Sequence, residues 1–241
     1  LRNSIMRDFD EYWNDYQKLY SYESINLIYR ERKLSEIINK YKPKKLLEIG
    51  CGFSPICLSY KQFESITLIE PGSKAYDHIN KSLSHNSLID CIHSNFEDAI
   101  PLIKEKEFDF IVCNGVLHEV EEPINFLKSI EKLMKENTKV YINVPNVNSL
   151  HRILAVKMGL IDDIYQPSVR NERLKQFTNF DKKSLTGMLT ENLSNITINS
   201  CNSFFLKPFT HDQMMEIIKK EIINEQVIES LYLISDIFPE H

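Results

Sequence analysis

The sequence predicts an α/β fold with a mainly parallel sheet flanked by helices. Between residues 43 and 147, short apolar runs alternate with amphipathic segments, which is typical of β-α-β units. One of these runs ends in a glycine-rich turn that leads towards an expected helix. The chain of 241 residues is 42% hydrophobic and 26% charged, so it has enough apolar material for a core. We therefore expect one globular domain with a small accessory part.

The first forty residues are expected to form helices. Apolar and aromatic residues recur there at helical spacing: Phe9, Tyr12, Trp13, Tyr16, Leu19 and Tyr20, and then Leu34, Ile37, Ile38 and Tyr41. Pro43 ends the second series. We expect residues 1–42 to form an N-terminal helical lid, whose aromatic residues pack in the core, close over a ligand or contact a second copy in a homodimer.

Strands and helices are expected to alternate through the central part of the chain. The strands are expected at residues 45–49, 66–70, 88–93, 108–113 and 140–144. The helices between them are expected to begin near Pro55, Ser73, Phe96 or Ile100, and Glu122, with Ser54 placed to cap the first of them. Residues 43–147 are therefore the predicted core.

Beyond residue 147 the sequence predicts mostly helices. They are expected at 148–158, with Gly159 as the stop, and at 182–191, 212–220 and 224–235. Residues 195–205 alternate as a late strand would. Residues 148–241 are therefore expected to add helices and one strand to the same domain.

Composition argues against several classes of function. The net charge of −5 gives no general attraction to nucleic acid. The five cysteines form no CxxC pair, as expected of reduced thiols in the cytoplasm. No apolar stretch approaches the roughly 18 residues of a membrane span, and no HxxxH pair indicates a metal. We expect a cytoplasmic protein that uses no nucleic acid, membrane or metal.

The sharpest local motif is LLEIGCGFSP, in which Glu48, Gly50 and Gly52 follow the end of the first predicted strand. Glycine in such a turn lets a ligand approach the backbone closely. Eighteen residues after Gly52, the second predicted strand ends in Glu70, at the distance where these folds present a carboxylate to two ribose hydroxyls. The pair predicts a site for a nucleoside-containing ligand.

A nicotinamide dinucleotide and S-adenosylmethionine both fit the glycine turn with the acid Glu70. Other residues of the motif distinguish between the two ligands. The third glycine of the dinucleotide motif is replaced by Pro55, and the acid Glu48 stands where dinucleotide sites carry an apolar residue. S-adenosylmethionine has an ammonium and a sulfonium group but no pyrophosphate. An added carboxylate therefore favours S-adenosylmethionine.

The motif ExGCGxxP, the acid Glu70, and the later NFED and VCNGVLHEVEEP resemble the successive motifs of class I S-adenosylmethionine-dependent methyltransferases, over residues 45–147. The resemblance implies a Rossmann-like sheet of the seven-stranded type, although the chain stops at 241 where members usually add a last antiparallel strand. Either the C-terminus is trimmed or that strand is missing. The donor residues that the resemblance implies are Glu48, Gly50, Cys51, Gly52, Phe53, Glu70, Pro71, Asn95, Phe96, Glu97, Cys113, Asn114 and Gly115, with Val116 and Leu117 after them.

Residues 143–161 resemble a subset of bacterial methyltransferases that modify sugars or other small precursors, often for surface polysaccharides. After the fourth strand the chain lacks the Asn/Asp-Pro-Pro-Tyr/Phe sequence of amino-methylating nucleic-acid enzymes, which favours oxygen as the acceptor atom. Polar and basic residues here could bind a phosphorylated or nucleotide-linked acceptor, or they could be ordinary surface residues. These substrate-site candidates are Asn146, His151, Arg152, Arg170, Lys207 and His211.

His118 is the candidate general base, because it follows the fourth strand and its ordinary pKa suits proton transfer near neutrality. A positional or structural role for His118 is an equal alternative. We expect an S-adenosylmethionine-dependent methyltransferase that acts on the hydroxyl of a small polar acceptor. The competing hypotheses are a nicotinamide-dependent oxidoreductase and a catalytically silent protein that binds an adenosyl ligand.

Overall fold

The protein is seen in a computed structural model, which describes residues 8–11, 22–168, 171–172, 174 and 176–241. The aromatic residues Tyr12, Trp13, Tyr16 and Tyr20 of the expected lid lie outside the described residues. The chain divides into two compact units, each made of separate segments. Unit 1 comprises Leu1–Lys18, Leu34–Leu117 and Ser129–Asn143, and unit 2 comprises Leu19–Lys33, His118–Lys128 and Val144–His241.

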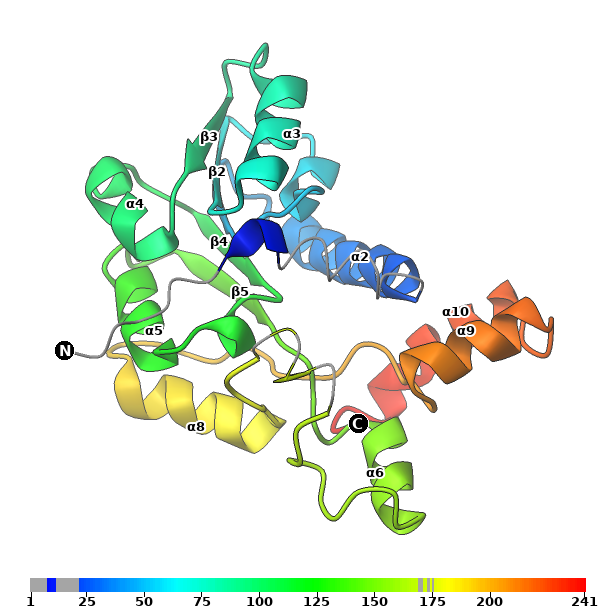
Figure 1. Cartoon of the computed structure of the whole chain (residues 1–241). Coiled ribbons are helices and arrows are strands. Elements are labelled where there is room, and N and C mark those ends of the chain that lie inside the picture. Colours follow the sequence, from blue (N-terminus) through cyan, green and yellow to red (C-terminus); the bar gives the residue numbers. More distant parts are fainter. Residues whose placement is uncertain (1–7, 12–21, 169–170, 173, 175) are drawn as a thin grey trace. The chain divides into compact units, whose positions relative to one another are not determined.

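Unit 1 contains a parallel sheet of five strands (Figure 1). The strands are β1 (Lys45–Ile49), β2 (Ser65–Glu70), β3 (Ile89–His93), β4 (Phe110–Asn114) and β5 (Lys139–Asn143), in the order β3-β2-β1-β4-β5. Their bounds agree with the predicted strands to within two residues at either end. The side chains of β1, β2 and β4 are buried almost throughout, as in parallel sheets covered on both faces. The predicted Rossmann-like architecture is confirmed, with five strands formed by the described residues.

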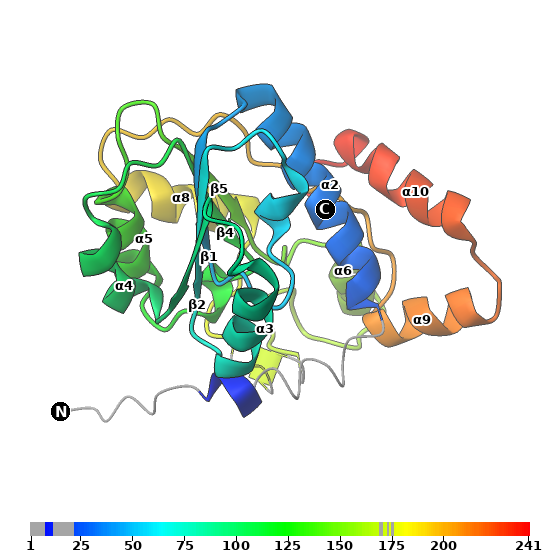
Figure 2. The same cartoon turned by 90° about the horizontal axis from the view of Figure 1, so that it is seen from above.

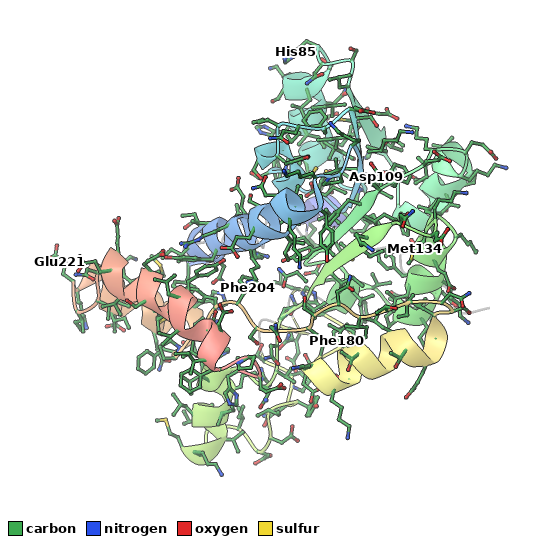
Figure 3. The ribbon with its side chains drawn as sticks, turned by 180° about the vertical axis from the view of Figure 1, so that it is seen from behind. His85, Asp109, Met134, Phe180, Phe204 and Glu221 are labelled. Atoms are coloured by element: carbon green, nitrogen blue, oxygen red, sulfur yellow. The ribbon has the colours of Figure 1, made fainter. Side chains whose placement is uncertain are left out.

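Helices of unit 1 cover both faces of this sheet. Helices α3 (Ser73–Leu83) and α4 (Phe96–Ile103) lie on opposite faces of the sheet, which is visible in both views (Figures 1 and 2). At the amino ends of the strands, the carboxylate of Asp109 (Figure 3) accepts hydrogen bonds from the backbone N–H groups of Lys44 and Lys45 at 2.8 and 2.9 Å. This contact fixes the start of β1 beside the start of β4.

The helix expected to begin near Pro55 is reduced to a single 3-10 turn, η1 (Ile56–Ser59). Pro55 is extended, with ψ 120°, and Ser54 provides no cap for the turn. Tyr60 is extended again, so the connection from β1 to β2 contains no α-helix. The N–H of Tyr60 donates to the Cys57 carbonyl and closes a 3-10 turn, and the backbone leaves the helical conformation at Tyr60, which accounts for the difference from the prediction.

The second half of helix α2 (Glu23–Tyr41) lies beside this short connection. Within unit 1, Leu34 and Ile38 are fully buried, and the hydroxyl of Ser35 lies 3.1 Å from that of Ser59 on η1. The ring of Tyr41 contacts Phe110 of β4, with centroids 6.3 Å apart. Residues 34–41 thus supply apolar surface on the face of the sheet where the expected helix is absent.

Unit 2 is mainly helical. Its helices are α6 (Leu150–Lys157), α8 (Lys182–Asn192), α9 (His211–Lys219) and α10 (Glu225–Leu233), with the turn η3 (Ile234–Ile237), while helix α5 (Pro123–Glu131) begins in unit 2 and ends in unit 1. The turn η2 (Leu117–Glu119) likewise begins in unit 1. Gly159 follows α6 with φ +70°, which confirms it as the stop of that helix. The core of unit 2 consists of Tyr22, Tyr29, Met214, Ile228 and Tyr232.

The prediction of a late strand at 195–205 is wrong. None of these residues, all of which the structure describes, forms a strand. Phe204 (Figure 3) instead packs against the core of unit 2, and the N–H groups of Ser203 and Leu206 donate to carbonyls of Pro239 and Leu231. Alternation predicts an extended backbone but not a partner strand, and here the hydrogen bonds go to a helix and a terminal turn.

None of the helices in the described part of the chain combines the length and the apolar composition needed to cross a bilayer.

Candidate active site

The strand order of unit 1 contains a switch point between β1 and β4. From β1 the chain adds β2 and β3 on one side, and then it returns to add β4 and β5 on the other side. In open parallel sheets, ligands bind outside the carboxyl ends of the strands at such a point. The donor residues expected from the sequence all lie at or just after the carboxyl ends of β1 to β4, in unit 1.

Glycines at this switch point adopt positive φ angles that other residues rarely adopt. Gly50 and Gly52 after β1 have φ +66° and +60°, and Gly115 after β4 has φ +73°. A Cβ atom on Gly50 would lie 2.6 Å from Cγ2 of Val116, so the turns after β1 and β4 are in contact. Only glycine fits Gly50 without displacing a neighbour, because both its φ and its surroundings exclude a side chain.

Glu70 joins the turns after β1 and β2. Its carboxylate is buried, and it accepts hydrogen bonds from the backbone N–H of Gly52 at 2.7 Å and from that of Gly72 at 2.8 Å. Its carbonyl accepts from the N–H of Ser94 beyond β3. A carboxylate offers about four lone pairs, so Glu70 can still accept from the two hydroxyls of a ribose.

Glu48 is the second buried carboxylate, at β1. One oxygen accepts from the N–H of Ile56 and the other from the N–H of Cys57, both at 2.9 Å. The side chain therefore caps η1, the role expected for Ser54. Burial raises the pKa of Glu48, and the nearby Glu70 adds to this effect, while the two N–H bonds oppose it.

The loop after β3 supplies an apolar and a polar surface. Phe96 at the start of α4 is buried, whereas Glu97 is exposed. The side-chain amide of Asn95 donates to Asp98 at 3.2 Å, and the carbonyl of Pro71 lies 3.2 Å from Nε2 of His93. The contact between His93 and Pro71 brings the loops after β2 and β3 together.

The cysteines of this site are neutral thiols. Cys113 is fully buried, and burial raises its pKa to about 12. The pKa of Cys51 is raised well above its ordinary value, also mainly by burial. Neither thiol is therefore a nucleophile at neutral pH. Beside Cys113, the side chain of Asn114 accepts from the Asn143 amide at 2.7 Å. Phe53, the remaining donor candidate, has its ring 5.6 Å from that of His78.

His118 is the first residue of a unit 2 segment and is buried. Its Nε2 accepts from the Gln176 side-chain nitrogen at 3.1 Å, and that nitrogen also lies 3.3 Å from a Glu119 oxygen. Asn171 donates to the Gln176 oxygen at 2.7 Å, which orients the amide with its nitrogen towards His118. An accepting Nε2 means a neutral imidazole with its proton on Nδ1. Sequence patterns gave no signal for Gln176, which lies 58 positions from His118.

Three of the substrate-site candidates come together within unit 2. The His151 N–H donates to the Lys207 carbonyl, and the Lys207 ammonium donates to Nδ1 of His211 at 3.2 Å. Nε2 of His211 lies 3.1 Å from the Asn26 side-chain amide. Burial, with the charges of Lys207, His211 and Arg152, lowers the pKa of His151 to about 3.

The other three candidates differ in placement. Arg152 donates to the carbonyls of Ile164 and Gln166 and so holds the loop after α6. Asn146 donates to the Ser203 hydroxyl and to the Glu240 carbonyl. Arg170 lies outside the described residues.

A profile of the methyltransferase domain family matches residues 27–192 of the chain. The chain is 28% identical, over 138 residues, to a mitochondrial ubiquinone biosynthesis O-methyltransferase of Schizosaccharomyces pombe. The matched region covers 55% of this chain and 47% of that protein. The chain thus spans about half the length of this curated relative. The plantazolicin methyltransferase BpumL, solved with a substrate analogue and SAH, is similar in fold, with a TM-score of 0.51, 17% identity and coverage of 74% of this chain and 66% of that one.

Proposed function

The chain belongs to the methyltransferase domain family, whose methyl donor is S-adenosylmethionine, and we propose that it methylates a hydroxyl of a small polar acceptor. The observation that carries this proposal is the pair of buried carboxylates, Glu48 and Glu70, at the switch point of the sheet. A dinucleotide needs free backbone N–H groups at a helix N-terminus for its pyrophosphate. Here a single 3-10 turn follows β1, and Glu48 already accepts from its N–H groups. A pyrophosphate would therefore meet a carboxylate, which disfavours a nicotinamide-dependent oxidoreductase.

The residues present fit the expected donor. Gly52 adds no side chain beside its N–H, which donates to Glu70, so a ligand at Glu70 can approach the backbone there. Glu70 can accept from ribose hydroxyls, and Glu48 adds negative charge for a cationic ligand. Bound S-adenosylmethionine supplies an electrophilic methyl carbon on a sulfonium, and the C–S electron pair leaves with sulfur. The protein has to align the acceptor and remove its proton.

We assign proton removal to His118, which follows Leu117 directly in the chain. As the acceptor oxygen bonds to the methyl carbon, its proton passes to Nε2 of His118. The Gln176 side chain bears on this role because it makes Nε2 the accepting nitrogen, at 3.1 Å. Nε2 has one lone pair, so the acceptor hydroxyl takes the place of the Gln176 amide before its proton moves. The name of the fission yeast relative, an O-methyltransferase, also supports oxygen as the acceptor atom.

A sugar, phosphorylated or nucleotide-linked precursor of a surface polysaccharide is the acceptor we propose. This part rests on the resemblance of residues 143–161. Action in the cytoplasm on a small molecule, rather than on nucleic acid, is supported by five free cysteines and a net charge of −5. A homodimer contact through the N-terminal aromatic residues stays a prediction.

The test is methyl transfer from radiolabelled S-adenosylmethionine to a panel of sugars and sugar phosphates. We expect His118→Ala to lower kcat at least about 100-fold because the base is lost, with little change in affinity for S-adenosylhomocysteine. His85→Ala, at an exposed position (Figure 3), is the matched control and should leave kcat unchanged. Full activity of His118→Ala would remove His118 from the mechanism, and donor binding without transfer to any acceptor would favour a silent binding protein.

A further inference from the structure

Unit 2 contains a cluster of basic and polar side chains from three separate parts of the chain. Tyr22 and Asn26 come from the segment around the start of α2, Ser149 and His151 from the start of α6, and Lys207 and His211 from the segment that leads into α9. The Ser149 hydroxyl lies 3.0 Å from Nδ1 of His151. We call these six residues the Lys207 cluster.

Hydrogen bonds orient the imidazole of His211 within the Lys207 cluster. The Lys207 ammonium can only donate, so Nδ1 of His211 must accept from it, and a neutral His211 then carries its proton on Nε2. Nε2 lies 3.1 Å from the side-chain nitrogen of Asn26, so the amide of Asn26 must be turned over for its oxygen to accept that proton. The ammonium lies 6.0 Å from the centre of the Tyr22 ring, and that ring meets His211 edge-on at 5.4 Å. The ammonium is therefore held in one place rather than extended into solvent.

The potential in this cluster is positive. His151 resists protonation, with its pKa lowered to about 3 by burial and then by Lys207, His211 and Arg152. His211 is also the first residue of α9, whose N-terminus adds partial positive charge. The region therefore attracts an anion.

A second observation concerns Tyr22, whose ring lies beside Lys207 and His211. The Tyr22 side chain is fully buried, and its hydroxyl has no hydrogen-bond partner among the described residues. Burial without a partner is costly for a hydroxyl, and its pKa is raised by that burial. An anion bound at the cluster would provide oxygen atoms that can accept from such a donor.

We propose that the Lys207 cluster binds a phosphate group, with Lys207 and Tyr22 as donors and His211 holding the ammonium of Lys207 in place. This inference rests on the proposed function only in identifying the phosphate as part of the methyl acceptor. Phosphate is favoured over carboxylate because the Lys207 ammonium and the Tyr22 hydroxyl belong to separate segments, and phosphate offers more acceptor oxygens to separate donors than carboxylate does. The acceptors are then phosphorylated compounds, and a reaction that phosphorylates the acceptor must precede methylation.

The experiment follows the histidine Hε1 resonances of His151 and His211 by NMR while inorganic phosphate, pyrophosphate or acetate is added to the full chain. We expect saturable shifts with phosphate or pyrophosphate, half-complete at about 1–10 mM, and much weaker shifts with acetate. Lys207→Met should weaken phosphate binding at least about tenfold, whereas Lys157→Met on the exposed side of α6 should not. Equal binding by the two variants, or an equal response to acetate, would overturn the proposal.

Tyr22→Phe separates ligand binding from folding. If the hydroxyl donates to the anion, this variant should bind phosphate several-fold more weakly yet melt at a higher temperature, since an unpartnered buried hydroxyl is removed. Unchanged phosphate binding would remove Tyr22 from the site. Calorimetry with S-adenosylhomocysteine distinguishes the proposed function from the phosphate site. If the chain binds phosphate but not S-adenosylhomocysteine, only the proposed function is rejected. Donor binding without any phosphate response rejects the Lys207 cluster alone.

Discussion

Glu48 and Glu70 act first on the backbone around them. Between them they accept four N–H bonds, from Ile56, Cys57, Gly52 and Gly72. The positions of both acids near the ends of β1 and β2 could be predicted from sequence, because their spacing from the glycines is local. The capping of η1 by Glu48 could not be predicted, because it depends on the expected helix being reduced to one turn.

Glu70→Gln is predicted to weaken S-adenosylhomocysteine binding about 10- to 100-fold, since a charged acceptor of ribose hydroxyls is lost. One amide hydrogen would also face the N–H of Gly52 or Gly72, so the free energy of unfolding should fall by about 1–3 kcal/mol. Calorimetric titration and urea unfolding measure the two effects. Glu64→Gln, at an exposed position in the β1–β2 connection, should change neither the affinity for S-adenosylhomocysteine nor the free energy of unfolding. Wild-type affinity in Glu70→Gln would exclude the ribose assignment.

Gly50→Ala is predicted to lower the free energy of unfolding by about 2–5 kcal/mol. The positive φ costs about 1–2 kcal/mol, and the contact with Val116 at 2.6 Å adds about 1–3 kcal/mol. Gly159→Ala is the matched control, because it has φ +70° but nothing within 4 Å of the added Cβ, and it should cost only the first amount. Adding Val116→Ala to Gly50→Ala should relieve the steric part. If both glycine variants lose the same stability in chemical denaturation, the turns after β1 and β4 are not in contact.

Among the secondary-structure elements, the strands were the most predictable. Continuous apolar runs that end in polar or glycine residues indicate buried strands, and each of the five was found near its expected position. The β1–β2 connection and residues 195–205 were not predictable in the same way. The β1–β2 connection depends on residues 34–41 beside it, and residues 195–205 depend on the core of unit 2. Local sequence patterns do not contain information about these neighbours.

Helix α8 offers a test of capping. The Asp181 carboxylate accepts from the Ser184 N–H at 2.7 Å, and this bond lowers the pKa of Asp181. Asp181→Ala should lower the free energy of unfolding by about 1 kcal/mol. Because the folded pKa is below the unfolded value near 3.9, the contribution is present above pH 4 and is lost as the pH falls further. Denaturant unfolding at pH 7 and pH 3 measures this, with Asp162→Ala as the exposed control. An undiminished difference at pH 3 would contradict the assignment.

The whole molecule places its chemical groups in two units. The donor residues belong to unit 1, whereas His118, Gln176 and the Lys207 cluster belong to unit 2. The sequence predicted the positions of the candidate donor residues because they follow consecutive strands. It could not predict the association of residues 22–26, 149–151 and 207–211, because contacts between segments so far apart depend on the folded chain.

The measurement that tests the account most directly is calorimetric titration of the whole chain with S-adenosylmethionine, S-adenosylhomocysteine and NAD. The two buried carboxylates and the occupied N–H groups of η1 predict binding of both adenosyl ligands at about 1–100 µM and no detectable binding of NAD. Binding of NAD in the absence of adenosyl-ligand binding would contradict the donor assignment and place the chain's chemistry among the nicotinamide-dependent oxidoreductases.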